Sequence, residues 1–190
     1  NGWLPAELVA LLGVFTMMSG LIGVVIQPSM ERLIEDVREG TLDFTLTKPE
    51  EAQVLVSIGQ VRVLRIVDIV AGIVIIAAAL SYRDGDVEGV SGLKFAVALA
   101  AGTAIMYSFW LVLATISFWF VRVENILMVF HSMYDAARWP ITIYPGWLRA
   151  ALTFLVPVAF AVTVPAEALV GRLQSDLLLA TVGLAALMLL

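Results

Sequence analysis

The sequence contains no cysteine, one histidine and only two lysines among its 190 residues. The missing cysteines exclude a disulfide framework, a thiolate nucleophile and a cysteine-based metal site. A single histidine excludes a pair of histidine ligands spaced along one helix. Charge is also scarce, because charged residues make up 14% of the chain, with 11 basic and 16 acidic side chains. This balance excludes a nucleic-acid-binding protein.

Apolar residues, in contrast, make up 61% of the sequence. Ordinary soluble domains contain about 45–50% apolar residues, and a domain of this length could not bury such an excess. The composition therefore predicts an all-α integral membrane protein. The chain begins at Asn1 without a basic region, and it ends within the apolar run Leu177–Leu190. We expect it to be one transmembrane domain, 1–190, taken from a longer polypeptide.

Predominantly apolar runs predict about five membrane-spanning helices. The first, Leu8–Met30, has 23 residues and reaches about 33 Å, enough to cross a hydrocarbon core of about 30 Å. We expect Pro28 to end it. The other predicted spans are Arg65–Tyr82, Phe95–Val121, the weaker Asn125–Arg138 and the short Leu177–Leu190.

The region 138–172 is predicted to be an external re-entrant hairpin rather than a span. Its uncharged stretch is divided by Pro157 and Pro165, and Pro157 leaves two pieces of about 10–12 Å each if helical. Neither piece can cross the hydrocarbon core alone. Tyr144 and Pro145 mark the beginning of this region. The arginines around it, which we interpret as headgroup anchors, are Arg138, Arg149 and Arg172.

The longest polar stretch is 29–62. Met30–Glu39 has the spacing of an amphipathic helix, with Gly40 as its C-cap, and residues 41–46 alternate between polar and apolar. Pro49 fits the first turn of a further helix that could continue into the second span. The basic residues of this region, Arg32, Arg38, Lys48, Arg62 and Arg65, outnumber Arg83 and Lys94 in the next loop. The positive-inside rule therefore predicts that 29–62 is cytoplasmic and that 83–92 is external.

The residues of a catalytic site are missing. The sequence has no P-loop, and it lacks the partner motifs of intramembrane serine and aspartyl proteases. We therefore expect a protein that is not an enzyme. Asp68 is either an ion-coupling carboxylate or, as we favour, a partner of Arg65 or Arg62 near the interface. His131 either lines a pathway or, as we favour, forms a hydrogen bond between helices.

Two blocks of sequence resemble permease subunits of the type-2 ABC exporter family, in the branch related to drug- and antibiotic-resistance permeases. The first block runs from Ile34 to Pro49 and contains Gly40-Thr41-Leu42-Asp43 followed by Lys48-Pro49. The second block contains Tyr144-Pro145, Leu148-Arg149, Leu152-Thr153-Phe154, Val156-Pro157-Val158-Ala159-Phe160 and Pro165-Ala166.

The resemblance implies six spans per subunit, of which this chain would supply about five, without the N-terminal interfacial helix and the first span. It also implies a dimer with a second copy or a homologous permease, and partner ATPase subunits that bind ATP and magnesium. The chain itself would bind no cofactor. The segment 29–62 would dock on the ATPase and couple its motion to the membrane. Its expected coupling residues are Glu35, Asp36, Arg38, Gly40, Thr41, Leu42, Asp43, Phe44, Leu46, Lys48 and Pro49.

These observations predict a multi-pass permease of the bacterial cytoplasmic membrane that exports a hydrophobic, amphipathic or glycan substrate. A permease needs spans, an internal docking surface and an energy source, and only the third is missing from the sequence. An ion-coupled secondary transporter working through Asp68 and a membrane scaffold without transport are the alternatives. The first would show inverted repeats, which the sequence lacks. Nothing in the residues chooses among the substrates.

Overall fold

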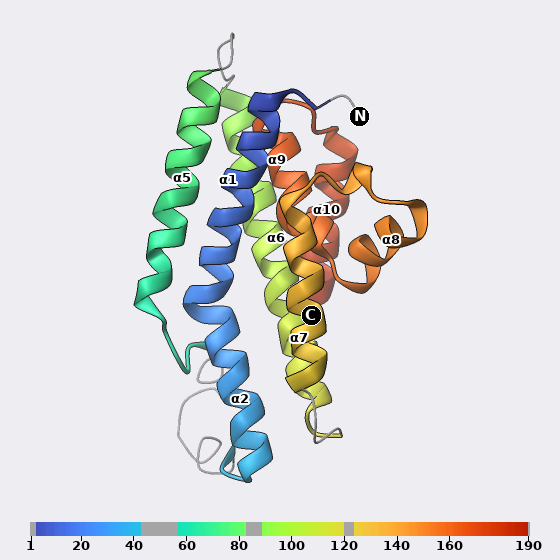
Figure 1. Ribbon diagram of the computed structural model, residues 1–190. Coiled ribbons are helices and arrows are strands. Elements are labelled where there is room, and N and C mark those ends of the chain that lie inside the picture. Colours follow the sequence, from blue (N-terminus) through green and yellow to red (C-terminus); the bar gives the residue numbers. More distant parts are fainter. Residues whose placement is uncertain (1–2, 43–56, 83–88, 120–123, 190) are drawn as a thin grey trace.

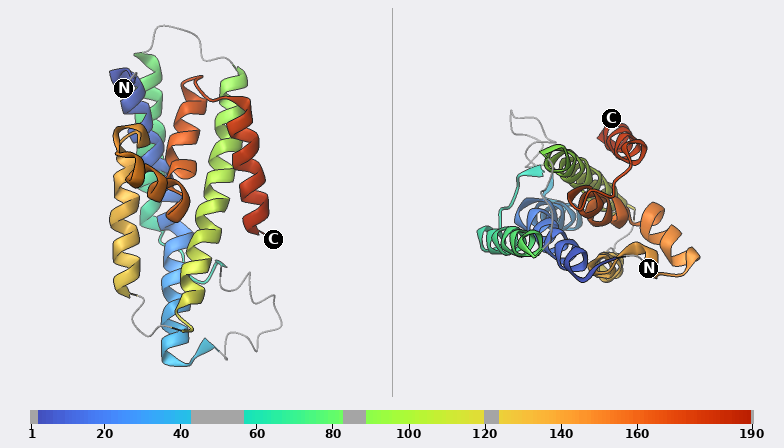
Figure 2. Two further views of the ribbon diagram at one scale, coloured as in Figure 1. Left: turned by 90° about the vertical axis from the view of Figure 1, so that its right-hand side faces the viewer. Right: turned by 90° about the horizontal axis from the view of Figure 1, so that it is seen from above.

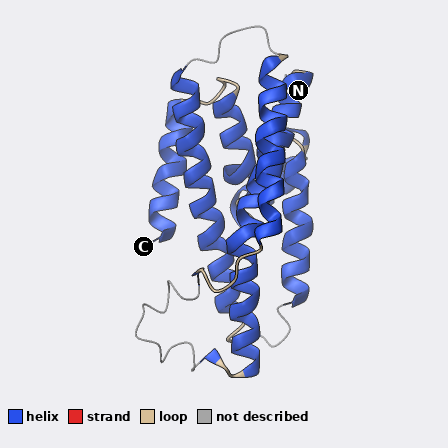
Figure 3. Cartoon of the chain, turned by 90° about the vertical axis from the view of Figure 1, so that its left-hand side faces the viewer, coloured by secondary structure: helices blue, strands red, loops and turns tan. Residues whose placement is uncertain are grey.

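The computed structural model describes residues 3–42, 57–82, 89–119 and 124–189, and every regular element in these ranges is helical (Figures 1 and 3). Three helices are long and apolar enough to cross a membrane, namely Pro5–Glu39, Val63–Ser81 and Ser91–Ile116. A fourth span results if the bent pair Gly146–Phe154 and Ala159–Leu169 counts as one crossing. The predicted all-helical membrane architecture is confirmed.

The first long helix consists of α1 (Pro5–Leu21), a π-helical turn at Ile22–Ile26 and α2 (Gln27–Glu39). It begins with Pro5, whose missing N–H is not needed in the first turn, and Glu7 accepts a hydrogen bond from the Leu4 amide at 2.9 Å. It ends, as predicted, at Gly40, which has a left-handed φ of 69°. The Thr41 amide bonds to the Asp36 carbonyl at 2.9 Å and completes the glycine cap.

The prediction that Pro28 ends this helix is wrong, because the helix continues through it for another eleven residues to Glu39. A proline inside a helix clashes with the carbonyl of the preceding turn and removes one hydrogen bond. Here the turn before Pro28 is widened to π-helical form, with the Gln27 amide bonded to the Ile22 carbonyl. The wider turn accommodates the ring, and a sequence pattern alone does not reveal it.

The second long helix is α5 (Ile66–Ser81), preceded by a 3₁₀ turn at Val63–Arg65. The chain is not helical between Gly59 and Arg62, so the expectation of a helix running from Pro49 straight into this span is wrong. Hydrogen bonds from the Gln60 and Arg62 amides to the first long helix hold these residues outside a helical conformation.

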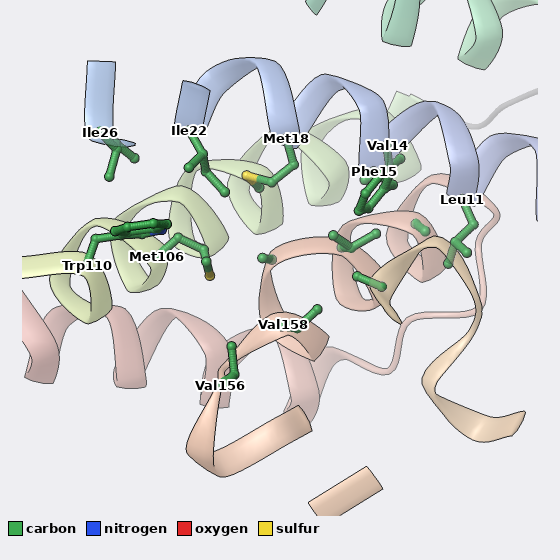
Figure 4. Packing of buried hydrophobic residues seen from close by; sticks show 14 of the residues in the cluster. Leu11, Val14, Phe15, Met18, Ile22, Ile26, Met106, Trp110, Val156 and Val158 are labelled. Atoms are coloured by element: carbon green, nitrogen blue, oxygen red, sulfur yellow. The ribbon is translucent and has the colours of Figure 1, made fainter. Parts of the chain in front are cut away.

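The third long helix is α6 (Gly89–Ile116), which shares the main hydrophobic core with α1. Figure 4 shows Met18, Ile22 and Ile26 on one side of this core, facing Met106 and Trp110 of α6. Met18 and Met106 are fully buried. The other buried core residues of α1 and α2, Ala10, Leu11, Val14, Phe15, Met30, Leu33 and Ile34, recur at helical spacing.

The remaining helices are α7 (Glu124–Asp135), α8 (Gly146–Ala150), α9 (Val164–Leu169) and α10 (Ser175–Leu189). Helix α7, predicted as a weak span, has 12 residues and reaches only about 18 Å. Helix α10 has 15 residues and is apolar. Both are shorter than the three helices that can cross a membrane.

The region 146–169 breaks at Pro157, as predicted, and its two arms meet at 79°. The arms are α8 with the π turn Ala151–Leu155, and the π turn Ala159–Thr163 with α9. Figure 2 shows α8 at the periphery of the bundle and α9 among the other helices. Their external position and their return to one side remain predictions. Pro165 does not break its helix, because a π turn precedes it as one precedes Pro28.

Candidate functional site: a loop clamp and a polar cavity

The predicted coupling segment is described in part. Asp43, Phe44, Leu46, Lys48 and Pro49 lie outside the described residues. Those that the structure describes, Glu35, Asp36, Arg38, Gly40, Thr41 and Leu42, lie on α2 or directly after it, at the α2 end of the molecule (Figure 1).

Asp36 stabilises the end of α2. Its side chain is 12% exposed and forms an ion pair with Arg32 at 3.0 Å, while the Thr41 hydroxyl lies 3.3 Å from its Oδ1. Glu35 lies 3.9 Å from the same arginine, with more than half of its side chain exposed. Leu42 packs against the main core. The described part of the coupling segment is therefore a capped, rigid helix end rather than a loose loop.

The C-terminal end of the polar segment 29–62 is attached to the first long helix next to Pro28. Because Pro28 has no N–H, the Val24 carbonyl receives no hydrogen bond from the position that would normally supply it. The Arg62 amide donates to this carbonyl instead, at 2.8 Å. A residue at the end of the polar segment thus satisfies the acceptor that a proline in the first helix leaves open.

Three side-chain contacts reinforce this attachment. The buried Ser29 hydroxyl donates to the Gln60 carbonyl at 3.2 Å and accepts from the Gln60 amide at 3.3 Å. The Arg62 guanidinium forms an ion pair with Glu31 at 2.7 Å. We call this set, Val24, Pro28, Ser29, Glu31, Gln60 and Arg62, the Pro28 clamp. The sequence analysis missed it, and the one available signal was a proline followed by a serine inside a helical pattern.

A polar cavity of about 320 Å³ lies beside the clamp, between α1, α5, α6 and α7. It brings together the two polar residues of the predicted spans that the sequence singled out, Asp68 and His131. The full lining is Phe15, Thr16, Ser19, Ile22, Gln27, Arg65, Asp68, Trp110, His131, Tyr134, Asp135 and Arg138.

Asp68 forms an ion pair with Arg65 at 3.0 Å, as favoured from the sequence. The imidazole of His131 packs edge-on against Trp110 of α6, with 5.1 Å between the ring centroids. A contact between helices is thus present at His131, and the residue also lines the cavity. Both residues therefore have a structural contact and face a space that a ligand can enter.

The arginines interpreted as headgroup anchors have partners within the chain. Arg138 pairs with Asp135 at 3.3 Å and lies over the ring of Phe15, 5.4 Å from its centroid. Arg149 donates to the backbone carbonyls of Thr142 and Tyr144. The sequence analysis also missed the partner of Arg172, which is Glu7. This carboxylate is 6% exposed, and the two side chains pair at 3.0 Å.

The helices, the clamp and the polar cavity define a polytopic membrane protein whose polar segment is hydrogen-bonded to its first long helix. A family model described as ABC-2 family transporter protein matches residues 1–190. The chain belongs to this family and is a membrane permease subunit of an ABC transporter, a class that works with an ABC ATPase subunit. Searches of curated proteins and of solved structures found no match.

Proposed function

We propose that this chain is the permease of an ATP-driven exporter, in which partner ATPase subunits bind ATP and magnesium and hydrolyse the nucleotide. Segment 29–62 is the cytoplasmic surface on which the ATPase docks. Two permease subunits, either identical or homologous, form the complex in the bacterial cytoplasmic membrane. The family match and the predicted orientation of this segment support the proposal.

The Pro28 clamp is the observation that carries this proposal. A docking segment can transmit force only if its ends are attached to the helices that must move. The hydrogen bond from Arg62 to Val24 and the pair of bonds between Ser29 and Gln60 provide this attachment at the return end. The α2 cap at Gly40 provides it at the other end. A pull on the segment therefore displaces α1 and α5 together.

Docking and coupling are separable experimentally. Phe44→Ala is expected to weaken capture of the ATPase by about 2 kcal/mol, because a central aromatic anchor outweighs a charge at the rim, and reversal of Asp43 is expected to cost less. Ser29→Ala should leave ATPase capture unchanged but lower transport-linked ATP hydrolysis about tenfold, because it removes two buried hydrogen bonds of the clamp.

The matched control is Ser132→Ala, since Ser132 is exposed and, within the described residues, its hydroxyl bonds only to the Met128 carbonyl of its own helix. Capture of the ATPase in a pull-down and hydrolysis in proteoliposomes are the two measurements. Wild-type values of both in Phe44→Ala, with the protein folded in the membrane, would show that this segment does not couple the two subunits. ATP hydrolysis at the wild-type rate in Ser29→Ala would show that the Pro28 clamp has no role in coupling.

A further inference from the structure

We propose that the polar cavity binds a zwitterionic amphiphile, with a phosphate and an ammonium group in its head and an apolar tail. The phosphate pairs with Arg65 and the ammonium group with Asp68, while the tail lies along α1 toward Phe15. The binding site stands on the geometry of the cavity, and only the identification of this ligand with the exported substrate rests on the proposed function.

The shape of the cavity suits an elongated ligand. Its lining on the first long helix extends from Phe15 to Gln27, twelve residues or about 18 Å along the axis. A volume of about 320 Å³ spread over this length makes a narrow slot. A chain-like molecule fits such a slot better than a compact one.

The charges in the cavity balance. Arg65 pairs with Asp68 at 3.0 Å, and Arg138 pairs with Asp135 at 3.3 Å. A zwitterion exchanges one ion pair for two new ones and leaves every charge with a partner. An anionic or a cationic ligand leaves one charge without a partner next to the hydrocarbon, which is costly. The arrangement therefore favours a zwitterion over a ligand that carries a single charge.

Of the two ion pairs in the cavity, the one between Arg65 and Asp68 can open and form new ion pairs with a ligand. Half of the Arg65 side chain and about a third of the Asp68 side chain are exposed, so both can turn toward a ligand. Arg65 lies near the start of the second long helix, where the interface with the headgroups is expected. A headgroup at this position keeps contact with water while the tail passes the aromatic side chains toward Phe15, where Arg138 lies over the ring.

Aromatic rings form the wall deeper in the cavity. Phe15 and Tyr134 are stacked with 5.4 Å between their centroids, and Trp110 lies against His131. These rings offer an apolar surface to a lipid tail. The Tyr134 hydroxyl itself is buried, so the rings are the part of this wall that a ligand would meet.

The site is also connected to the clamp. Arg65 follows Arg62 by three residues, and its amide donates to the Arg62 carbonyl at 3.0 Å. Gln27, which lines the cavity, directly precedes Pro28. Movement of the clamp therefore shifts the arginine that holds the phosphate, so the ligand site and the docking segment respond to the same displacement.

The test is native mass spectrometry of the delipidated full chain in a nonionic detergent, with three lipids that have the same tails. Phosphatidylcholine is the zwitterion, phosphatidylglycerol the anion and ethylphosphatidylcholine the cation. We expect the wild type to bind phosphatidylcholine about tenfold more tightly than the other two. Asp68→Asn should shift the preference to the anionic lipid and Arg65→Gln to the cationic lipid.

Opposite shifts in the two single variants distinguish a headgroup site from a merely structural ion pair. Loss of a structural ion pair would weaken the binding of all three lipids alike. Asp176→Asn, an exposed neutralisation at the start of α10, is the control and should keep the wild-type preference. If Arg65→Gln does not fold, the double variant Arg65→Gln with Asp68→Asn has no unpaired charge and should lose all discrimination.

Equal binding of the three lipids by the wild type, or the same shift in both single variants, would overturn the proposal. The measurement needs no ATPase. A failed lipid preference with normal ATPase coupling therefore contradicts this site alone, and a failed ATPase capture with a normal lipid preference contradicts the proposed function alone.

Discussion

Three glycines set the distance between α1 and α5. A Cβ atom added to Gly72 would lie 2.5 Å from the Met17 amide nitrogen, and one added to Gly20 would lie 2.7 Å from that of Ile69. A Cβ atom added to Gly13 would likewise lie 2.8 Å from the side chain of Ile76. Small residues that let two helix backbones approach are typical of packing in membranes, where burial of apolar surface gives little drive. Gly13 and Gly20 of α1 and Gly72 of α5 thus permit the close approach of the two helices.

Gly72→Ala is therefore expected to separate the two helices and to lower the free energy of unfolding by about 1–3 kcal/mol, because the new methyl group meets backbone atoms that cannot move away. Gly183→Ala is the matched control in α10, where an added Cβ has nothing within 4 Å. The control should be neutral or slightly stabilising. Thermal melting in detergent measures both, and equal melting temperatures for the two variants would contradict this account of the packing.

The ion pair between Glu7 and Arg172 is asymmetric. Glu7 is 6% exposed, while 41% of the Arg172 side chain reaches the surface and its guanidinium lies 5.5 Å from the centroid of the Trp3 ring. Loss of the arginine leaves a buried carboxylate without its partner, while loss of the acid leaves a cation that water can reach.

Arg172→Met should accordingly lower the free energy of unfolding by about 3 kcal/mol, and Glu7→Gln by about 1 kcal/mol, because glutamine still accepts the Leu4 amide. Glu39→Gln, at the exposed end of α2, should leave stability unchanged. Melting temperatures of the three variants give the order directly. A larger loss in Glu7→Gln than in Arg172→Met would contradict the burial argument.

At the scale of elements, the two prolines inside helices in the described part of the chain, Pro28 and Pro165, are each preceded by a π turn. Ile22–Ile26 precedes Pro28, and Ala159–Thr163 precedes Pro165. The wider turn reduces the clash of the ring with the preceding carbonyl and lets the helix continue. At Pro28 the consequence is also mechanical, since the open Val24 carbonyl attaches the helix to Arg62.

Pro28→Ala restores an amide that competes with Arg62 for the Val24 carbonyl. We expect the Arg62 amide to exchange its hydrogen at least tenfold faster, since loss of one hydrogen bond is worth about 1 kcal/mol or more. Pro5→Ala, at the first turn of α1, should leave this amide unchanged. Hydrogen–deuterium exchange of peptides covering 57–66 makes the measurement. Unchanged protection in Pro28→Ala would show that the clamp does not depend on the missing proline N–H.

At the scale of the molecule, the three long helices place the capped end of α2 at one end and the N-terminus at the other (Figures 1 and 2). The bent pair of helical arms in region 146–169 determines the membrane topology of the rest of the chain. If its two arms form a re-entrant hairpin, the chain before α8 and the chain before α10 lie on the same side of the membrane. If they form one broken span, these parts lie on opposite sides.

Single cysteines at Thr142 and Gln174 distinguish the two topologies, because both positions are exposed and the sequence has no other thiol. The hairpin predicts that a membrane-impermeant maleimide labels both in intact cells, while a cysteine at Glu39 reacts only after lysis. Labelling of Thr142 and Gln174 from opposite sides would establish a broken span. Labelling of Glu39 in intact cells would reverse the predicted orientation.

Local signals in the sequence determined the class of protein, the family and several elements. Hydropathy placed the long helices, helical spacing and Gly40 predicted α2 and its cap, and the position of Pro157 predicted the bend. These features depend on neighbouring residues, because burial in lipid and helix geometry act over a few turns. The pairing of Asp68 with Arg65 was predictable for the same reason, since the two residues are one turn apart.

Only the tertiary structure decided the functional arrangement. The Val24 carbonyl and the Arg62 amide are 38 positions apart, so the attachment of the polar segment at Pro28 depends on a partner that no local pattern reveals. The cavity likewise forms where α1, α5, α6 and α7 meet, and the pairing of Glu7 with Arg172 joins the two ends of the sequence. The sequence determines which residues can make such contacts, and the packing of distant helices determines which contacts form.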